Sequence, residues 1–295
     1  MRLFLDNNQL VLNDSLGCVT FQPAGLHYVY DLEVVRVSDL QSRSCKLGFQ
    51  RHYLYECPLI ILVTEGECRQ WIDFEPVDCH RGSLISVKIG QVHSLGSHSG
   101  WDGYMLLLRP EGFIQDAQIQ SLSSLPAICS LNNKDSTVVE ISLKQIHEDS
   151  LRFYNELSSE LLRFQLHALA ARLNLLVTEQ KSLSILDKSG QRFLCFLQCL
   201  EQHFKQWHSP VRYAQSMACS EKTLSRICLG NSGETAKTLI TKRITLEAKR
   251  LLCYSDLNVS EISEQLGFSA TTYFCKFFKR ETKLSPIVFR NHNGL

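Results

Sequence analysis

The chain has 295 residues, 44% of them hydrophobic and 21% charged, and its formal net charge is +1. This is the composition of an ordinary globular protein, and the length favours two domains that each bury a core. No apolar run approaches the roughly 20 residues of a membrane-spanning helix, and Asp6 interrupts the start where a secretory signal would stay apolar. We therefore expect a cytoplasmic protein with no membrane segment.

The 12 cysteines are scattered singly, with no Cys-x-x-Cys pair, which favours reduced and mostly buried thiols over a disulfide framework. Cys195 and Cys199 lie one helical turn apart, so a redox or metal role for these two thiols stays open as an alternative. We assign no metal and no cofactor to the chain.

Short apolar runs separated by Gly, Pro and Asp extend from about Leu10 to Leu108, as in Leu59-Ile-Ile-Leu-Val63. Such runs predict short strands in a small sandwich or barrel, whose mouth is a usual site for a small ligand. In such a domain, aromatic residues line a pocket about as often as they belong to the core or the rim. The candidates to line a pocket for an aromatic or sugar-like compound are His52, Tyr53, Tyr55, Trp71, His93 and Trp101.

An amphipathic helix is predicted from Asn155 to Val177, because apolar residues recur three or four positions apart with charged residues opposite. This helix either packs on its own sheet or pairs with a second chain, and the pattern alone does not choose between the two. Residues 180–190 are polar and small, which predicts a linker. The repeating apolar residues are Leu157, Leu161, Phe164, Ala168, Ala171 and Leu175.

The charges of the chain are divided unequally between its two parts. Residues 190–295 carry 15 Lys and Arg against 8 Asp and Glu, a net charge of +7, whereas the residues before them carry 16 against 22, a net charge of −6. A basic part beside an acidic one is typical of a polyanion-binding module joined to another domain, although many basic faces are merely solvated.

Two short helices joined by about three residues are predicted between Ser209 and Ile227. Pro210 suits the first turn of the first helix, Ser220 suits the N-cap of the second, and the helical pattern breaks at Ala218. This is the helix-turn-helix pattern, whose second helix enters the major groove of DNA.

A second copy of this pattern lies between Val259 and Arg280, where Gly267 supplies a left-handed turn and either Asn258 or Ser260 caps the first helix. A shift of fifty positions superposes the two second helices, so the module is predicted to be duplicated. The aromatic residues near this copy have helical spacing, which favours a core over a platform that stacks single-stranded bases. They are Phe268, Tyr273, Phe274, Phe277 and Phe278.

Between the two copies, residues Ala236 to Leu252 predict one long amphipathic helix. This helix is expected to act as a spacer. Two recognition helices held by a stiff connector can enter successive major grooves, about 34 Å apart, on one face of a duplex.

The C-terminal part, residues 190–292, resembles the DNA-binding domain of the AraC/XylS family of regulators. The motifs that carry the resemblance are Glu247-Ala-Lys-Arg-Leu-Leu252, Val259-Ser-Glu-Ile262, Leu266-Gly-Phe268, Tyr273-Phe-Cys-Lys-Phe-Phe-Lys-Arg280, Leu284-Ser-Pro286 and Phe289-Arg290. The chain departs from the family pattern at Lys283, where glycine is usual, at Ser263, where alanine is usual, and at Cys228-Leu229, where an aromatic and a base are common.

The resemblance implies DNA contacts from both recognition helices. Arg226 is suited to read guanine bidentately or to clamp a phosphate, whereas Lys276, Lys279 and Arg280 are suited to neutralise the DNA backbone. The alternative is that these helix faces are merely solvated. The residues implied are Lys222, Ser225 and Arg226 in the first unit, and Thr271, Thr272, Cys275, Lys276, Lys279 and Arg280 in the second.

Residues 45–113 resemble, more loosely, the cupin-like effector domain of many members of that family. The matching segments are Arg51-His-Tyr-Leu-Tyr55, Thr64-Glu-Gly-Glu67, Trp71-Ile-Asp-Phe74, Arg81-Gly-Ser-Leu84, Gly90-Gln-Val-His93 and Gly103-Tyr104. A cupin enzyme holds a metal through a His-x-His pair, a glutamate and a later histidine. Here Gln50 stands at the first histidine, while His52, Glu56 and His93 remain.

The expected fold is multidomain α and β, with an N-terminal cupin-like β-barrel, a helical dimerisation segment and a C-terminal all-α domain with two helix-turn-helix motifs. The expected boundaries are 1–135 for the effector domain, 136–180 for the dimerisation segment, 181–190 for the linker and 191–295 for the DNA-binding domain.

The expected function is a ligand-responsive transcriptional regulator without catalytic residues, an activator by resemblance. Its expected partners are double-stranded promoter DNA, RNA polymerase, a small-molecule effector and a second copy of the chain. One alternative is a metal-dependent cupin enzyme with a DNA-binding appendage. The other is an architectural protein whose DNA binding ignores both ligand and sequence.

Overall fold

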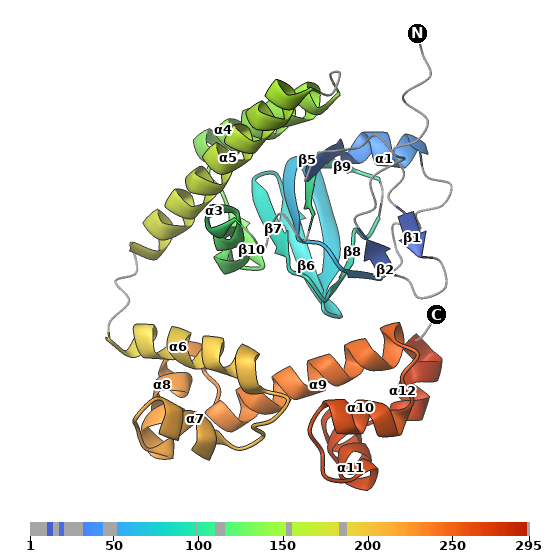
Figure 1. Ribbon diagram of the computed structural model, residues 1–295, viewed down its shortest axis with the longest axis vertical. Coiled ribbons are helices and arrows are strands. Elements are labelled where there is room, and N and C mark those ends of the chain that lie inside the picture. Colours follow the sequence, from blue (N-terminus) through green and yellow to red (C-terminus); the bar gives the residue numbers. More distant parts are fainter. Residues whose placement is uncertain are drawn as a thin grey trace. The chain divides into compact units, whose positions relative to one another are not determined.

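The computed structural model describes residues 11–13, 18–20, 32–43, 52–97, 99–109, 116–151, 155–182 and 188–293. The chain divides into two compact units, Met1–Gln180 and Lys181–Leu295. The first unit holds the strands, and the second is helical (Figure 1). Among the described residues, no helix combines the length and apolar character needed to cross a bilayer.

The first unit is built on one sheet whose branches meet at its longest strand, β5. Its described strands follow the order β1-β2-β4-β8-β5-β7-β10, while β3 pairs with β9, and both β6 and β9 pair with β5. The strands are β1 (Val11–Asn13), β2 (Cys18–Thr20), β3 (Leu32–Arg36), β4 (Tyr53–Tyr55), β5 (Leu59–Ile72), β6 (Glu75–His80), β7 (Ser83–Val87), β8 (Gln91–Ser94), β9 (Trp101–Leu108) and β10 (Ile128–Ser130).

Alternation along β5 separates two apolar clusters. Leu59, Ile61 and Val63 point into the barrel with the tyrosines of β4, whereas Ile60 and Leu62 point to the opposite face. This is the period of two that a strand imposes, and here both faces are buried. The first half of β5 pairs with β7 and β9 and its end pairs with β6 and β8, so β5 joins the two parts of the expected cupin-like fold.

Helices cover the outer face of this sheet. They are α3 (Ala117–Gln120), the short 3-10 helix η1 (Ser121–Ser124), α4 (Asn133–Ser150) and α5 (Glu156–Ser182), while α1 (Val37–Arg43) follows β3. Helix α5 packs on this face through apolar residues spaced three or four apart, as a helix stripe requires. These are Leu162, Leu166, Leu169, Leu173 and Val177.

The second unit is an all-helical domain with two helix-turn-helix motifs, which confirms the expected fold class. Figure 1 shows α7 and α8 toward one end of the long helix α9, and α10 and α11 toward its other end. The helices are α6 (Lys188–His203), α7 (Pro210–Ser216), α8 (Glu221–Ser232), α9 (Ala236–Tyr254), α10 (Val259–Gln265), α11 (Thr271–Thr282) and α12 (Pro286–Asn293).

Side-chain caps fix where these helices start. Ser220 accepts a hydrogen bond from the Thr223 amide at the start of α8. Asn258 rather than Ser260 caps α10, in a capping box that Glu261 completes. An N-cap of this kind contributes about 1 kcal/mol, so the recognition helices begin at defined residues.

The turns of the two motifs have the same hydrogen bonds at positions 49 residues apart. The amides of Ala218 and Cys219 bond to carbonyls of α7 as the amides of Gly267 and Phe268 bond to those of α10, in the Schellman pattern. Ala218 and Gly267 both have positive φ, 49° and 76°. At Gly267 a Cβ would lie 1.9 Å from the Lys205 carbonyl oxygen, so that turn requires glycine.

We predict opposite effects for two Gly→Ala substitutions in this domain. Gly267→Ala should lower the free energy of unfolding by about 2–4 kcal/mol, because it adds backbone strain and a steric clash. Gly230→Ala should raise it by about 0.5–1 kcal/mol, because Gly230 lies within α8 with open space around it. Urea unfolding measures both; equal small effects would contradict the described turn.

Candidate functional site

Helix α9 joins the two motifs as a single uninterrupted helix. Its 19 residues span about 28 Å at a rise of about 1.5 Å per residue. It buries a stripe of Ile240, Ile244, Ala248 and Leu252 against the neighbouring helices. The predicted spacer is therefore present, and both motifs contact it.

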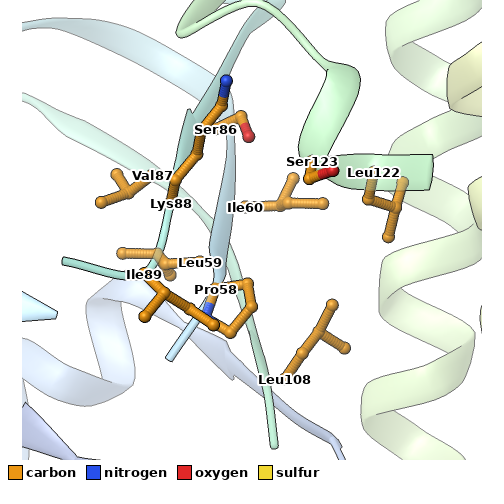
Figure 2. Close-up of a pocket in the computed structure, with 10 residues that line it drawn as sticks. All are labelled: Pro58, Leu59, Ile60, Ser86, Val87, Lys88, Ile89, Leu108, Leu122 and Ser123. Carbon is orange, nitrogen blue, oxygen red and sulfur yellow. The ribbon is translucent and has the colours of Figure 1, made fainter. Parts of the chain in front are cut away.

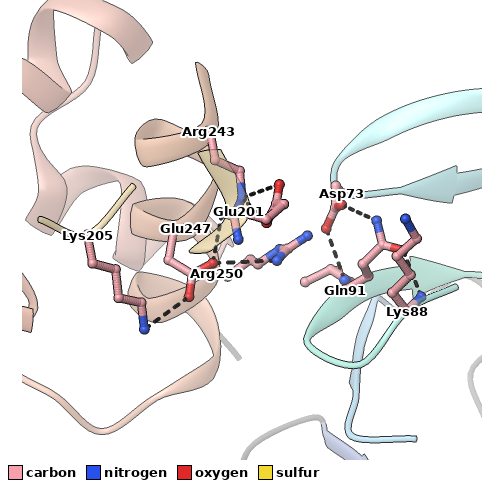
Figure 3. A network of polar contacts seen from close by, with 9 residues as sticks. Asp73, Lys88, Gln91, Glu201, Lys205, Arg243, Glu247 and Arg250 are labelled. Carbon is pink, nitrogen blue, oxygen red and sulfur yellow. Dashed lines mark hydrogen bonds and ion pairs between the residues drawn. The ribbon is translucent and has the colours of Figure 1, made fainter. Parts of the chain in front are cut away.

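A cluster of ion pairs fixes the middle of α9 to α6. Arg243 bonds Glu201 of α6 at 2.9 Å and Glu247 at 3.0 Å, and its guanidinium lies 3.8 Å from the centroid of the Phe204 ring. Arg250 also lies near Glu247, at 3.5 Å (Figure 3). Because Arg243 and Glu247 are largely withdrawn from solvent and share several partners, this network resists bending between the motifs.

Arg290 fastens α12 to the end of α9. Its guanidinium donates hydrogen bonds to the carbonyl of Leu252 at 2.8 Å and to that of Leu257 at 2.6 Å. The last carbonyls of a helix have no partner within the helix, and a cation there also interacts favourably with the helix dipole. Two positions of the family motif, Glu247 and Arg290, therefore hold the spacer rather than a ligand.

The turn of the second motif also rests on the loop that precedes the first. His208 contacts the carbonyl oxygen of Leu266 at 2.8 Å, and its ring lies 4.7 Å from that of Phe268. With Gly267 against Lys205, these contacts join the motifs a second time, independently of α9.

The two candidate recognition helices, α8 and α11, present the implied DNA contacts outward. Their inner faces are buried through Leu224, Ile227, Phe274 and Phe278. Exposed side chains are Lys222, Arg226, Thr272, Lys276, Lys279 and Arg280, and half-buried ones are Ser225, Thr271 and Cys275.

These cations differ in their partners. Arg280 pairs with Glu281 at 2.6 Å, whereas Lys222, Arg226, Lys276 and Lys279 form no ion pair within the described part of the chain. In the first motif, exposed Leu229 occupies the position that Lys279 has fifty residues later. Each recognition helix therefore carries two cations without an ion pair in the described part of the chain, Lys222 and Arg226 on α8 and Lys276 and Lys279 on α11.

The aromatic cluster of the second motif is a core with one exception. Phe274 and Phe278 are fully buried with their ring centroids 5.9 Å apart, and the Phe268 ring lies against that of Phe274 at 5.4 Å. Tyr273, however, is 60% exposed. Its expected place in the core was wrong, because it lies next to Phe274 on the turn that faces solvent.

In the barrel, four of the six candidate ligand residues are packed against other residues. Tyr53, Tyr55, His93 and Trp101 are buried, and the rings of Tyr55 and His93 meet edge to face at 5.6 Å. The Nε2 atom of His93 lies 2.8 Å from Oε1 of Gln70, while Nδ1 has no hydrogen-bond partner among the residues that the structure describes. Burial, with the nearby charge of His52, lowers the pKa of His93 to about 3, so this ring is neutral at physiological pH.

The other two candidates, His52 and Trp71, form a half-buried aromatic group with Phe74. His52 lies 6.1 Å from Trp71 and 6.3 Å from Phe74, centroid to centroid, and burial lowers its pKa. The described residues contain no group of three His, Cys, Asp or Glu side chains able to hold a metal. Gln50 lies outside the described residues, and His52, Glu56 and His93 do not form such a group.

The sequence did not indicate a pocket of about 190 Å³ on the helix-covered face of the sheet (Figure 2). None of the six candidate ligand residues lines it. Its walls come from the ends of β5, β7 and β9 and from η1, and they are Pro58, Leu59, Ile60, Ser86, Val87, Lys88, Ile89, Leu108, Leu122 and Ser123. Of the residues that line this pocket, only those in the apolar run Leu59–Val63 stood out in the sequence. That run predicted a strand and not a pocket.

Helix α5 carries a second apolar face opposite the one that packs on the sheet. Leu157, Phe164 and Leu175 are 76%, 56% and 62% exposed, and Leu161 and Ala168 are exposed beside them. The sequence predicted charged residues opposite this stripe. Instead the opposite side is the apolar face that packs on the sheet.

Comparison with known proteins agrees with both units. Residues 213–292 match the family profile described as a helix-turn-helix domain, and residues 48–169 match that of an AraC-like ligand binding domain. Over 101 residues the chain is 30% identical to the HTH-type transcriptional activator RhaS of Escherichia coli O139:H28, covering 34% of this chain and 36% of RhaS.

A second relative, the regulatory protein PocR of Salmonella typhimurium, is 37% identical over 51 residues, or 17% of each chain. The chain thus spans about a third or less of the length of these curated relatives. The structure of ToxT from Vibrio cholerae is 15% identical, with a TM-score of 0.41, over 88% of this chain and 97% of ToxT.

The buried His93 leads to a prediction about pH. Its pKa of about 3 in the fold lies below the ordinary value of 6.5, so below pH 6.5 the unfolded chain binds a proton that the folded chain does not. Stability should therefore fall as the pH decreases, and His93 should contribute about 1–2 kcal/mol of that loss between pH 6.5 and pH 5.

Urea unfolding of the wild type and of His93→Gln at the two pH values measures this contribution. The variant should lose less stability between them. His80→Gln, the same substitution at an exposed histidine, is the matched control. An equal pH dependence in wild type and His93→Gln would show that His93 titrates normally.

Proposed function

Because the chain belongs to the AraC family of regulators, we propose that it is a ligand-responsive transcriptional activator that binds promoter DNA through α8 and α11. The observation that carries this proposal is the pair of exposed recognition helices joined by one braced helix. In this family the N-terminal domain binds ligand and the C-terminal domain binds DNA, which favours a regulator over a metal-dependent enzyme.

The dimensions support binding to one face of a duplex. The major groove is about 12 Å wide and admits one helix, and successive major grooves on one face lie about 34 Å apart. Helix α9 spans about 28 Å, and the recognition helices add width at each end. One chain is thus suited to occupy two neighbouring grooves.

We assign base reading chiefly to Arg226, with Lys222, Ser225, Thr271, Thr272 and Cys275 in supporting contacts. Lys276 and Lys279 neutralise phosphates, because they are exposed and without an ion pair within the described residues. Arg280 contributes less than the family pattern implies, since its guanidinium is already bonded to Glu281.

We further propose that the chain acts as a homodimer through the exposed face of α5. A helix normally presents one apolar stripe to its own core, and a second, solvent-facing stripe is suited to a partner. Burying one such Leu or Phe side chain contributes about 1.5–3 kcal/mol, so a few of them suffice for association. The residues are Leu157, Leu161, Phe164, Ala168 and Leu175.

We assign one of these proposed roles to each segment of the chain. Residues 1–135 form the effector domain, 136–180 the dimerisation segment, 181–190 the linker and 191–295 the DNA-binding domain. Effector binding in the first unit would change the population of dimer or interdomain geometries, for which a coupling of about 1–3 kcal/mol is sufficient. Because RhaS is named an activator, we include RNA polymerase among the partners.

Two substitutions separate base reading from charge neutralisation. Arg226→Ala should lower the preference for the specific site over random DNA by about 1–3 kcal/mol, because a bidentate base contact is lost. Lys279→Ala should weaken binding to specific and random DNA alike and lower the slope of affinity against salt concentration by about 1.

Footprinting upstream of the neighbouring genes supplies the specific site, and fluorescence anisotropy with specific and random duplexes measures both effects. Lys242→Ala is the matched control, since Lys242 of α9 is already paired with Glu234. If Arg226→Ala and Lys279→Ala reduced specific and random binding equally, the assignment of Arg226 would be wrong.

The dimer is tested by Phe164→Asp, which places a charge on the exposed face of α5. The dimer dissociation constant should rise by at least tenfold, since the loss of one buried aromatic exceeds about 1.4 kcal/mol. Sedimentation equilibrium measures association. Ile287→Asp, an equally exposed apolar residue of the second unit, should leave it unchanged. Equal association of both variants and the wild type would contradict the proposal.

A further inference from the structure

The pocket in the first unit has one polar end and one apolar end. Figure 2 shows the Lys88 ammonium and the Ser86 hydroxyl at one end, and Pro58, Ile89 and Leu108 at the other. Apart from the Ser123 hydroxyl, the rest of the lining is aliphatic. A ligand that fits both ends carries a polar group on an apolar body.

The polar end of the pocket is suited to bind an anion. Lys88 is exposed at the rim and forms no ion pair with any described residue. Ser86 is 4% exposed, and its side chain lines the pocket at the same end. A hydroxyl at this place can donate a hydrogen bond to an oxygen of an anion that pairs with the lysine.

The size of the pocket limits the apolar body. A cavity of about 150 Å³ lined by aliphatic side chains holds one benzene molecule. At about 190 Å³, this pocket accommodates one ring or a short alkyl chain together with a carboxylate. Larger aromatic or sugar-like compounds exceed it.

One wall of the pocket is held rigidly. The turn between β7 and β8 carries Lys88, whose amide donates to Oε1 of Gln91 at 2.7 Å. The Gln91 amide in turn donates to Asp73 at 2.7 Å, and Asp73 also accepts from the Val92 amide (Figure 3). These bonds fix the backbone of the lysine before any ligand enters, which lowers the entropic cost of binding.

The opposite wall belongs to η1, which is joined to α5. The residue before Leu122, Ser121, accepts a hydrogen bond from the Asn174 amide of α5 at 2.6 Å. One turn earlier, Asp116 at the start of α3 bonds His167 of α5, also at 2.6 Å. A ligand that touches Leu122 therefore meets a wall that is directly connected to the helix with the exposed apolar face.

We propose that this pocket is the effector site and that it binds a small monocarboxylate with an apolar body of one ring or about six carbons. The carboxylate bonds Lys88 and Ser86, and the body lies against Ile60, Leu108 and Leu122. The site lies on the outer face of the sheet, away from His52, Tyr55 and His93. The role of this pocket as the effector site rests on the proposed function. Binding of the carboxylate to the pocket does not depend on that function.

Isothermal titration calorimetry of the full chain with hexanoate and phenylacetate tests the site without DNA. We expect saturable binding of one molecule per chain, with 1-hexanol and hexylamine at least about tenfold weaker, because they lack the anion that Lys88 pairs with. Lys88→Met should weaken hexanoate about tenfold and leave 1-hexanol unchanged. Lys134→Met, at an exposed lysine of α4, is the matched control and should change neither.

Leu122→Phe, which fills part of the pocket, should weaken both the acid and the alcohol. The proposal is overturned if neither acid binds, if 1-hexanol binds as tightly as hexanoate, or if Lys88→Met behaves like Lys134→Met. Promoter footprinting of the same preparation keeps the two proposals apart. A protein that binds one promoter site but no acid refutes only the pocket, and one that binds the acids but prefers no DNA refutes only the regulator.

Discussion

The DNA-binding unit depends on the ion-pair cluster around Arg243 and Glu247. A helix-turn-helix motif is too small to bury much surface alone, so its orientation comes from what it packs against. Here both motifs pack on one helix, and Arg243 bonds that helix to α6 while Arg290 closes its far end. Breaking a largely buried pair leaves an uncompensated charge, so the arrangement is retained as a whole or lost as a whole.

The duplication of the motif is visible in the backbone as well as in the sequence. Each motif needs two left-handed positions, one in the turn and one after the recognition helix. The first motif has Ala218 and Gly233 there, and the second has Gly267 and Lys283. Only Gly267 is required by a close approach, to Lys205; at the other positions a side chain is tolerated at a cost of about 1 kcal/mol. The departure from the family at Lys283 is therefore a matter of strain, and the turn is preserved.

Local patterns allowed much of this architecture to be predicted from the sequence. Caps, spacing and the turn glycine are properties of a few neighbouring residues, and they located both motifs and the long helix. Pairing across the sheet is not local. It decides that Tyr55 and His93 pack together, and that the ends of β5, β7 and β9 meet η1 around a pocket. The aromatic residues were predicted to bind ligand because of their chemistry, whereas nothing in the sequence around Ser86 and Lys88 indicates a binding site. The same limit explains α5, where periodicity revealed one apolar stripe and concealed that a second one opposes it.

The two faces of α5 connect the pocket with the rest of the proposed mechanism. One face is part of the core of the effector unit, so any shift of α3 and η1 acts on it through Ser121 and Asp116. The other face is exposed and apolar, so its free energy depends on whether a partner covers it. Because a packed core resists compression, a small displacement at the buried face of α5 moves the whole helix as a rigid body. The exposed apolar face of α5 then moves with it. An effector that fills the space beneath η1 therefore needs only a modest difference in affinity between two positions of α5 to favour one assembly over another.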